Sequence, residues 1–523
     1  MTNKRPGRTQ RIAVDDTPLN ANPDIDARVG WLLAMSRLHH TDDSHQDGRA
    51  FSLQLGDAGF PASRSLVSRW ESGEIPISYE AMTAYESVLG LQVGQISSIT
   101  GYIKATIPSL KARVVRPKLD PATSTFADRL DELIDLAETG GALARDWQEL
   151  GWHLAAAPMV HMRRPTWETL SARLVHQLPR SIKVSYRQFS TAAMNLAAIP
   201  RAQDILVDAI AQYISDPAVQ VITSPAGLLD RLPTRHAARL VLEMIEKPQN
   251  SLTYATGVWL ATQKVVRRAF TDWERTERDI LVLRAWRRSP TQASEELAEL
   301  IAELPEGMRA TLVQAADKAG RRKLGYVVQH GEELVASKAE QFSQDLASSA
   351  RQRVPQDPTY DEDQMLARLI REALFHRDSE RRHLAALLIA SSPFGRAVTD
   401  ELLLRLAGPW NAEWIRSRLS TLVRYLSDDS HRMRMLAFVE DGSDEVATPL
   451  TQGLGHLGFS PMSDQAIRNS LGKEWSPRER AKMYALGMSG SPGLLAISKS
   501  SQPAPWQKAA ARWWLDQGPA IRQ

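Results

Sequence analysis

The 523-residue chain contains no cysteine. This absence excludes a disulfide framework and every zinc or iron–sulfur site that needs a cysteine ligand. No stretch approaches 18 consecutive apolar residues, so we expect no transmembrane helix. The N-terminus, MTNKRPGRTQR, has no apolar run after its charges and does not look like a secretory signal. These absences are compatible with a cytoplasmic protein, which is the localisation we expect.

The chain also lacks a strong net charge, because 64 basic residues face 61 acidic ones. A net charge of +3 does not by itself indicate a nucleic-acid partner, so the distribution of charge matters more. Two stretches are basic without neighbouring acids: the tail before Asp15, and residues 104–118, which include Lys111, Arg113 and Arg116. Both stretches are equally compatible with plain solvated linkers.

The length exceeds what one hydrophobic core usually serves, so we expect at least two domains or a repeat array. Residues 1–23 are polar and aperiodic, which predicts a disordered basic arm. Residues 104–121 contain three prolines, which predict an extended basic linker. Residues 122–523 have helical periodicity interrupted by proline or glycine, with no convincing strand pattern. The sequence therefore predicts an all-α protein.

Four segments of the C-terminal region share a pattern of a helix-start residue, early basic residues and apolar residues at helical spacing. They are residues 378–393, 429–443, 476–492 and 504–519. Their spacings, about 50, 47 and 28 residues, are loose beside the roughly 40–47 residues of HEAT and armadillo repeats. The region resembles a divergent HEAT-like α-solenoid, and an irregular helical domain is the alternative. We expect it to dimerise and to receive a signal from a small molecule or a protein.

The N-terminal region, residues 24–103, has the hydrophobic spacing of five short helices in a compact all-α unit. In the third helix, SRSLVSRWESG, Ser63 is a good N-cap and Gly73 ends the helix. Leu66, Val67 and Trp70 fall on the inward side. The opposite side of this helix has hydrogen-bond donors and no acid, and consists of Arg64, Ser65, Ser68 and Arg69.

A helix, a tight turn at Gly59 and a capped helix with a donor-rich face form the helix-turn-helix arrangement, whose second helix enters the major groove. Arginine can bond a guanine in bidentate fashion, and serine can bond base edges or phosphate. We therefore predict that the donor-rich face reads bases in double-stranded DNA.

Residues 25–103 resemble the Cro/C1-type (XRE-family) helix-turn-helix domain of bacterial regulators. The residues that carry the resemblance are Gly59 at the turn, Ser63 at the cap, and the V-S-R-W-E-x-G run of residues 67–73. The resemblance implies base reading by Arg64, Ser65, Ser68 and Arg69. It also implies a structural role for Glu71, which holds the neighbouring turn, alongside Gly59, Trp70 and Gly73.

Two features depart from this family. The loop HHTDDSHQDG, residues 39–48, is longer than usual. The second helix opens with Gly48 and Arg49, where the family often has serine or threonine followed by a phosphate-clamping glutamine. We expect Arg49 to take over the phosphate contact. The other expected DNA-backbone contacts are Ser63, Lys111, Arg113 and Arg116.

Three other patterns have an ordinary structural explanation. GLGHLG, residues 453–458, matches a dinucleotide-binding fingerprint but follows a helical pattern, which favours close helix packing. The histidines and aspartates of residues 39–47 could hold a metal, although a solvated loop is the simpler interpretation. Trp506, Trp513 and Trp514 could line a ligand pocket, but core packing is more common. We predict no metal site, no cofactor and no enzymatic activity.

These observations predict a cytoplasmic, nucleoid-associated bacterial transcription regulator that binds double-stranded DNA as a homodimer. The alternative is an α-solenoid scaffold or architectural protein that its helix-turn-helix domain localises to DNA. Because a single small domain reads only a few base pairs, specific binding normally needs two copies about one helical turn apart.

Overall fold

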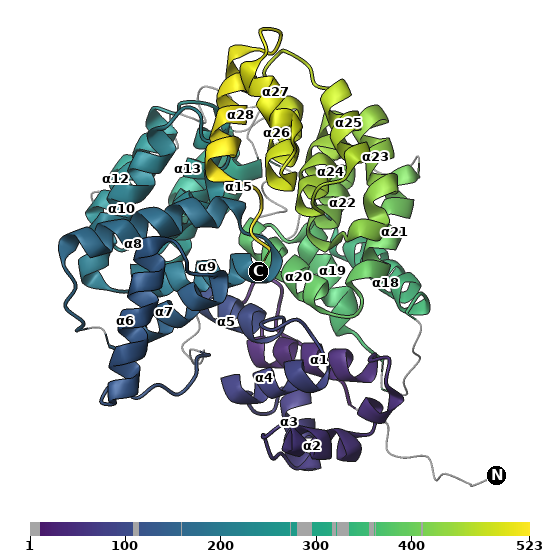
Figure 1. Ribbon diagram of the computed structural model, residues 1–523. Helices are drawn as coiled ribbons and strands as arrows, with labels where there is room; N and C mark the ends of the chain where they lie inside the picture. Colours follow the sequence, from purple (N-terminus) through teal and green to yellow (C-terminus); the bar gives the residue numbers. More distant parts are fainter. Residues whose placement is uncertain are drawn as a thin grey trace. The chain divides into compact units, whose positions relative to one another are not determined.

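The computed structural model describes residues 11–107, 115–157, 159–271, 274–279, 295–315, 321, 334–354, 360, 362–408 and 412–522. Every regular element in these ranges is a helix, which confirms the predicted all-α fold class (Figure 1). The chain divides into two compact units: unit 1 contains Met1–Pro117 and Leu334–Gly493, and unit 2 contains Lys118–Glu333 and Leu494–Gln523. This division differs from the prediction, which placed residues 122–523 in one region.

The N-terminal segment of unit 1 contains the five predicted helices. They are α1 (Ile25–Leu38), α2 (Gly48–Asp57), α3 (Arg64–Glu71), α4 (Tyr79–Val88) and α5 (Ser97–Thr106), with the short 3-10 helix η1 (Asp43–Gln46) between α1 and α2. The side chains of Asp24, Asp47, Ser63 and Ser78 accept from first-turn amides of α1 to α4 and fix where these helices begin. We call residues 25–106 the N-terminal segment.

The rest of unit 1 is an array of paired helices, residues 336–489. α18 (Ala336–Gln352) and α19 (Met365–Phe375) begin it. One row follows as α20 (Ser379–Ser391), α22 (Glu413–Leu426), α24 (Asp444–His456) and α26 (Pro477–Ser489), in which each helix packs on the next. α21 (Gly395–Ala407), α23 (Arg432–Asp441) and α25 (Pro461–Asn469) pack against α22, α24 and α26, and η4 (Asp429–His431) precedes α23.

The helices of the first row start at residues 379, 413, 444 and 477, which are 34, 31 and 33 residues apart. This spacing is shorter than the 47- and 50-residue spacings of the segments compared in the sequence. Those segments are not equivalent: residues 378–393 and 476–492 contain α20 and α26 of one row, whereas residues 429–443 contain α23 of the other. Helices of both rows bury one apolar side, so their sequence patterns look alike.

The glycines of GLGHLG lie in and just after α24, where no strand precedes them. A Cβ atom at Gly453 would lie 3.2 Å from Cα of Arg424 in α22, and one at Gly455 would lie 2.9 Å from Cα of Ala485 in α26. These glycines therefore let α24 pack closely between its two neighbours. This arrangement agrees with close helix packing and not with a nucleotide-binding turn.

Unit 2 is also helical. Its elements are α6 (Ser124–Thr139), α7 (Ala144–Ala156), α8 (Arg164–Gln177), η2 (Leu178–Arg180), α9 (Lys183–Ala197), α10 (Pro200–Ser215), α11 (Thr223–Ala226), η3 (Gly227–Asp230), α12 (Arg235–Glu246), α13 (Ser251–Val266), α15 (Glu295–Ala302), α16 (Glu306–Ala315) and α28 (Pro505–Gln517), with α27 (Gly493–Lys499) at the unit boundary. α7 packs on α9, α8 on α10, and α12 on α13. Trp513 and Trp514 are buried, as expected for core residues. No helix among the described residues is long and apolar enough to cross a membrane.

A buried ionic cluster joins the N-terminal segment to the array. Arg28 of α1 donates from both terminal nitrogens to the Glu372 carboxylate in α19, at 2.9 and 2.5 Å, and from Nε to Asp15 at 2.7 Å. Arg381 of α20 donates to the same carboxylate at 3.1 Å. Burial by itself raises the pKa of Glu372, but the Arg28 and Arg381 guanidiniums outweigh burial and lower this pKa well below its usual range. Glu372 is therefore charged.

A second contact lies one turn along α1, where Trp31 Nε1 donates to Asp363 Oδ1 at 3.0 Å. The same carboxylate oxygen accepts from the first amides of α19, at Met365 and Leu366. Asp363 thus satisfies the first amides of α19 and also holds the fully buried Trp31 ring. The N-terminal segment is consequently packed onto the array by both polar and apolar contacts.

Residues 11–23, which we expected to belong to a disordered arm, also contact the array. Asp15 is buried in the ionic cluster, and Ile12 and Ala13 are also buried. His376 Nε2 donates to the Leu19 carbonyl at 2.9 Å. A segment without helical periodicity is therefore fixed because its carboxylate and carbonyl groups satisfy buried donors of the array.

We predict that Glu372→Ala lowers the free energy of unfolding of unit 1 by about 3–5 kcal/mol, because it leaves buried guanidiniums without a counter-charge. Urea unfolding of the full chain measures the loss, and hydrogen exchange should locate it at α1 and α19. Asp444→Ala is the control, since the ion pair of Asp444 with Arg478 is solvent-exposed on the Asp444 side. It should cost at most about 1 kcal/mol. Equal losses in both variants would contradict the prediction.

Candidate functional site

The structure places all four predicted base-reading residues on one exposed surface of α3. Ser63 Oγ accepts from the Leu66 amide at 3.2 Å and caps the helix. Val67 and Trp70 are buried beneath it. The side chains exposed on the opposite side are those of Arg64, Ser65, Ser68 and Arg69.

A buried ion pair fixes α3 from behind. Glu71 accepts from Arg37 of α1 at 2.6 and 2.7 Å, and Tyr85 Oη donates to it at 3.3 Å. Arg37 Nη1 also donates to the carbonyls of His45 and Gln46, both at 2.8 Å. Burial, together with the charge of Glu71, raises the pKa of Tyr85 well above its usual value. Glu71 thus holds the loop before α2 through Arg37, a residue that stands outside the recognisable motif of residues 59–73.

Two glycines allow α1 and the end of α3 to touch. A Cβ atom at Gly30 would lie 2.7 Å from the Gly73 amide nitrogen and the Trp70 carbonyl oxygen. Gly73 has φ +72°, and a Cβ atom there would lie 2.7 Å from Cα of Ala27. Gly59, at the turn between α2 and α3, has φ +84°. The φ values at Gly59 and Gly73 are in the left-handed region that favours glycine.

The exposed side of α3 itself has no acid, but the fold brings two acids to its edges. Glu74, just after α3, accepts from Arg69 Nε at 2.9 Å. Asp47 lies at the start of α2 near Arg64, whose Cγ atom is 3.7 Å from the position of a Cβ atom at Gly48. The amides of Ala50 and Arg49 lower the pKa of Asp47, and the charge of Arg64 lowers it further.

The expected phosphate contacts have different surroundings. Asp47 Oδ1 accepts from the Arg49 and Ala50 amides at 2.7 and 3.1 Å, so a carboxylate already occupies the N-terminus of α2. The Arg49 side chain is exposed, as is Arg116. Lys111 and Arg113 lie outside the described residues. Lys104, at the start of the predicted linker, instead belongs to α5 and is paired with Asp26 at 2.8 Å.

The histidine-rich loop has local contacts of its own. His45 and His40 face each other with 2.8 Å between their Nδ1 atoms, and the Asp42 amide donates to His40 Nδ1 at 3.0 Å. The His39 ring packs on Phe394 of the array. Within the described ranges, no group of three or more histidines and carboxylates is arranged to hold a metal ion.

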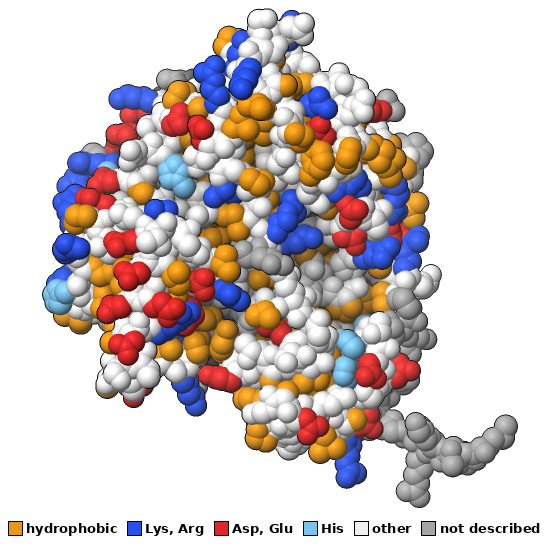
Figure 2. All heavy atoms as spheres, in the orientation of Figure 1, with side chains coloured by type: hydrophobic (Ala, Val, Ile, Leu, Met, Phe, Trp, Pro, Cys, Tyr) orange, Lys and Arg blue, Asp and Glu red, His pale blue; other side chains and the backbone are white. Residues whose placement is uncertain are grey.

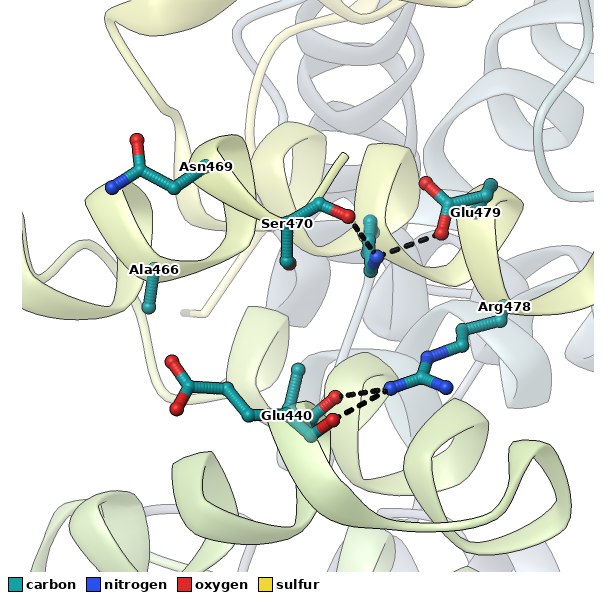
Figure 3. Close-up of a pocket in the computed structure, with 8 residues that line it drawn as sticks. Glu440, Ala466, Asn469, Ser470, Arg478 and Glu479 are labelled. Atoms are coloured by element: carbon teal, nitrogen blue, oxygen red, sulfur yellow. Dashed lines mark hydrogen bonds and ion pairs between the residues drawn. The ribbon is translucent and has the colours of Figure 1, made fainter. Parts of the chain in front are cut away.

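A cavity of about 490 Å³ lies between α23, α25 and α26 of unit 1 (Figure 3). Arg478 donates to the Val439 and Glu440 carbonyls at 2.7 and 3.2 Å. Lys482 donates to the Ser470 carbonyl and, at 2.7 Å, to Glu479. Both cations thus neutralise carbonyls at helix ends. We assign this cavity a structural role, because its cations are already used within the protein.

Unit 2 contains a buried lysine, Lys264, which belongs to no recognisable sequence motif. Its Nζ donates to the Leu232 carbonyl at 2.9 Å. Burial lowers the pKa of Lys264 to about 8, although the carboxylates of Asp230 and Glu274 oppose this effect. This hydrogen bond joins α13 to the residues just after η3, so we assign Lys264 a role in packing.

On the face drawn in Figure 2, the N-terminal segment carries several acidic side chains and few basic ones. Because Glu74 pairs with Arg69 and Asp47 lies near Arg64, these two arginines belong to a surface of mixed charge and not to a continuous basic patch. No protein-family model, curated protein or solved structure matches this chain.

We predict that Gly30→Ala destabilises the chain by about 1–3 kcal/mol, because the added methyl group would clash with the backbone at the end of α3. Gly56→Ala in α2 adds the same methyl group to a helix where no atom lies within 4 Å. This control should be neutral or should stabilise the chain by up to about 1 kcal/mol through helix propensity. Calorimetry of both full-length variants would test the difference, and matching melting temperatures would contradict it.

Proposed function

We propose that this chain is a sequence-specific DNA-binding transcription regulator in which α3 enters the major groove. The observation that carries the proposal is the construction of α3. Four donors lie together on its exposed side, while Trp70 and the buried Glu71–Arg37 pair hold its other side. Base readers are most selective when the groups behind them fix their position.

The chemistry of this surface supports base reading. Arg64, Ser65 and Ser68 have no side-chain hydrogen bond to any other described residue, so their donors are available to base edges and phosphates. The order of α2, a glycine turn and a serine-capped α3 is that of the helix-turn-helix of Cro/C1-type regulators, which the sequence of residues 25–103 also resembles.

We propose that the array orients the reading helix. Arg28 and Trp31 fix α1 to Glu372 and Asp363 of the array, and α1 packs on α3. A signal that changes the array would therefore also change the orientation of α3. The proposed protein is a homodimer, because two recognition helices on a two-fold axis supply the discrimination that a single helix lacks. Its proposed setting is the bacterial nucleoid.

The second candidate function is a protein-interaction scaffold localised to DNA. It is favoured by five large apolar side chains of the array that are about half exposed: Leu404 at 53%, Met433 at 56%, Phe459 at 48%, Met462 at 49% and Trp475 at 46%. Exposed apolar side chains mark protein contacts where they form a contiguous patch. Genome-wide mapping of bound sites separates the candidates, since a regulator gives sharp peaks upstream of genes and a scaffold gives diffuse occupancy.

We predict that Arg69→Ala costs about 1–3 kcal/mol of affinity for the specific site and removes sequence preference there, as expected for a lost base contact. Competition binding with specific and random duplexes measures both effects. Arg164→Ala is the control, because Arg164 is an exposed arginine of unit 2 that is also paired with a glutamate. Undiminished specificity of Arg69→Ala would show that Arg69 is not a reader.

We predict that removing residues 1–11, which spares the buried Ile12, or neutralising Lys111, Arg113 and Arg116, weakens binding to all DNA sequences alike. Each lost phosphate contact should reduce the slope of log affinity against log salt concentration by about 0.9, because fewer counterions are released. Titrations over a range of salt concentrations measure this slope. An unchanged slope would mean that these residues make no phosphate contacts.

We predict that the full chain is a dimer in solution and that it protects two half-sites related by a two-fold axis. Light scattering gives the mass of the particle, and footprinting gives the symmetry of the protected DNA. A monomer that protects a single asymmetric half-site would contradict the dimer and would favour the scaffold.

A further inference from the structure

The ion pair of Arg69 with Glu74 is the one side-chain hydrogen bond that a predicted base reader makes within the described part of the chain. Its side chains are 47% and 60% exposed, so both are accessible to a ligand lying against α3. Exposed ion pairs contribute little to stability, so stability alone does not account for an acid at this position. An acid beside a DNA-reading helix also repels phosphate, so general affinity for DNA does not account for Glu74 either.

The geometry of the pair restricts how Arg69 can bind. Glu74 Oε1 accepts from Nε of Arg69, so one edge of the guanidinium plane is occupied. The two terminal nitrogens of Arg69 have no partner among the described residues. Their outer hydrogens point away from the aliphatic stem of the side chain. A guanidinium held in this way offers two parallel donors end-on, which match the O6 and N7 acceptors of guanine.

The second carboxylate oxygen of Glu74 has no hydrogen-bond partner among the described residues either. A carboxylate oxygen accepts from the N4 amino group of cytosine, which lies beside guanine O6 on the major-groove edge of a G·C pair. The exposed side of α3 has no asparagine or glutamine, the residues that bond adenine in bidentate fashion. The chemistry of this end of α3 therefore suits a G·C pair.

We propose that Glu74 determines specificity by positioning Arg69, and that the Arg69–Glu74 pair selects a G·C base pair in each half-site. The inference rests on the proposed function and deepens it by naming the base pair that is read. The carboxylate lowers affinity for phosphates in general and fixes the guanidinium for one base. Glu74 thus raises the ratio of specific to non-specific binding while it lowers overall affinity.

The test selects bound duplexes from a randomised library with the full chain, three variants of the pair and one control variant. The wild-type chain should prefer guanine at one position of the half-site by roughly 5- to 150-fold. Arg69→Ala should lose this preference. Glu74→Ala should lose most of this preference but bind random DNA more tightly. Glu74→Gln keeps an oxygen that can accept from Arg69 Nε, so it should retain a measurable part of the guanine preference.

Glu168→Ala is the matched control, because it removes the same charge from an exposed Arg–Glu pair in unit 2. It should leave the base profile unchanged. If Glu74→Ala and the wild-type chain select the same profile, Glu74 does not set specificity. If the position that depends on Arg69 is an A·T pair, the base assignment is wrong although the regulator function stands. If the wild-type chain selects no sequence, the proposed function itself fails.

Discussion

The buried bond between Arg28 and Glu372 is the interaction on which the arrangement of unit 1 depends. It joins two residues that are 344 positions apart in the sequence, and both side chains are almost completely buried. Two buried charges are expensive to desolvate, so such a pair persists only when further partners satisfy it. Asp15, Arg368 and Arg381 supply those partners, and the cluster thereby fixes the N-terminal segment against the array.

Local features of the fold could be read from the sequence because they depend on neighbouring residues. The cap at Ser63, the turn at Gly59 and the inward position of Trp70 each follow from a residue type at a fixed spacing. The partner of Arg28 could not be found in this way, because a buried arginine has the same sequence signature as an exposed one. For the same reason, the acids beside α3 appear only when the chain folds.

The array shows a second limit of sequence patterns. Helices of its two rows both bury apolar residues at helical spacing, so a comparison of patterns cannot tell which row a helix belongs to. The glycines of α24 distinguish them physically, since Gly453 and Gly455 face the backbones of α22 and α26. Close packing on both sides identifies α24 as an interior member of its row. The sequence motif alone is compatible with both helix packing and nucleotide binding.

Unit 1 is built from two stretches of the chain, Met1–Pro117 and Leu334–Gly493, and this affects how it forms during synthesis. Residues 118–333 belong to the other unit, so the N-terminal segment leaves the ribosome long before α19 and α20 exist. Until then Arg28 and Trp31 have no partners, and closing so long a loop carries an entropic cost. Such non-local contacts form late and slowly. The nascent chain therefore exposes an unfinished α1 surface during most of translation, when chaperones have access to it.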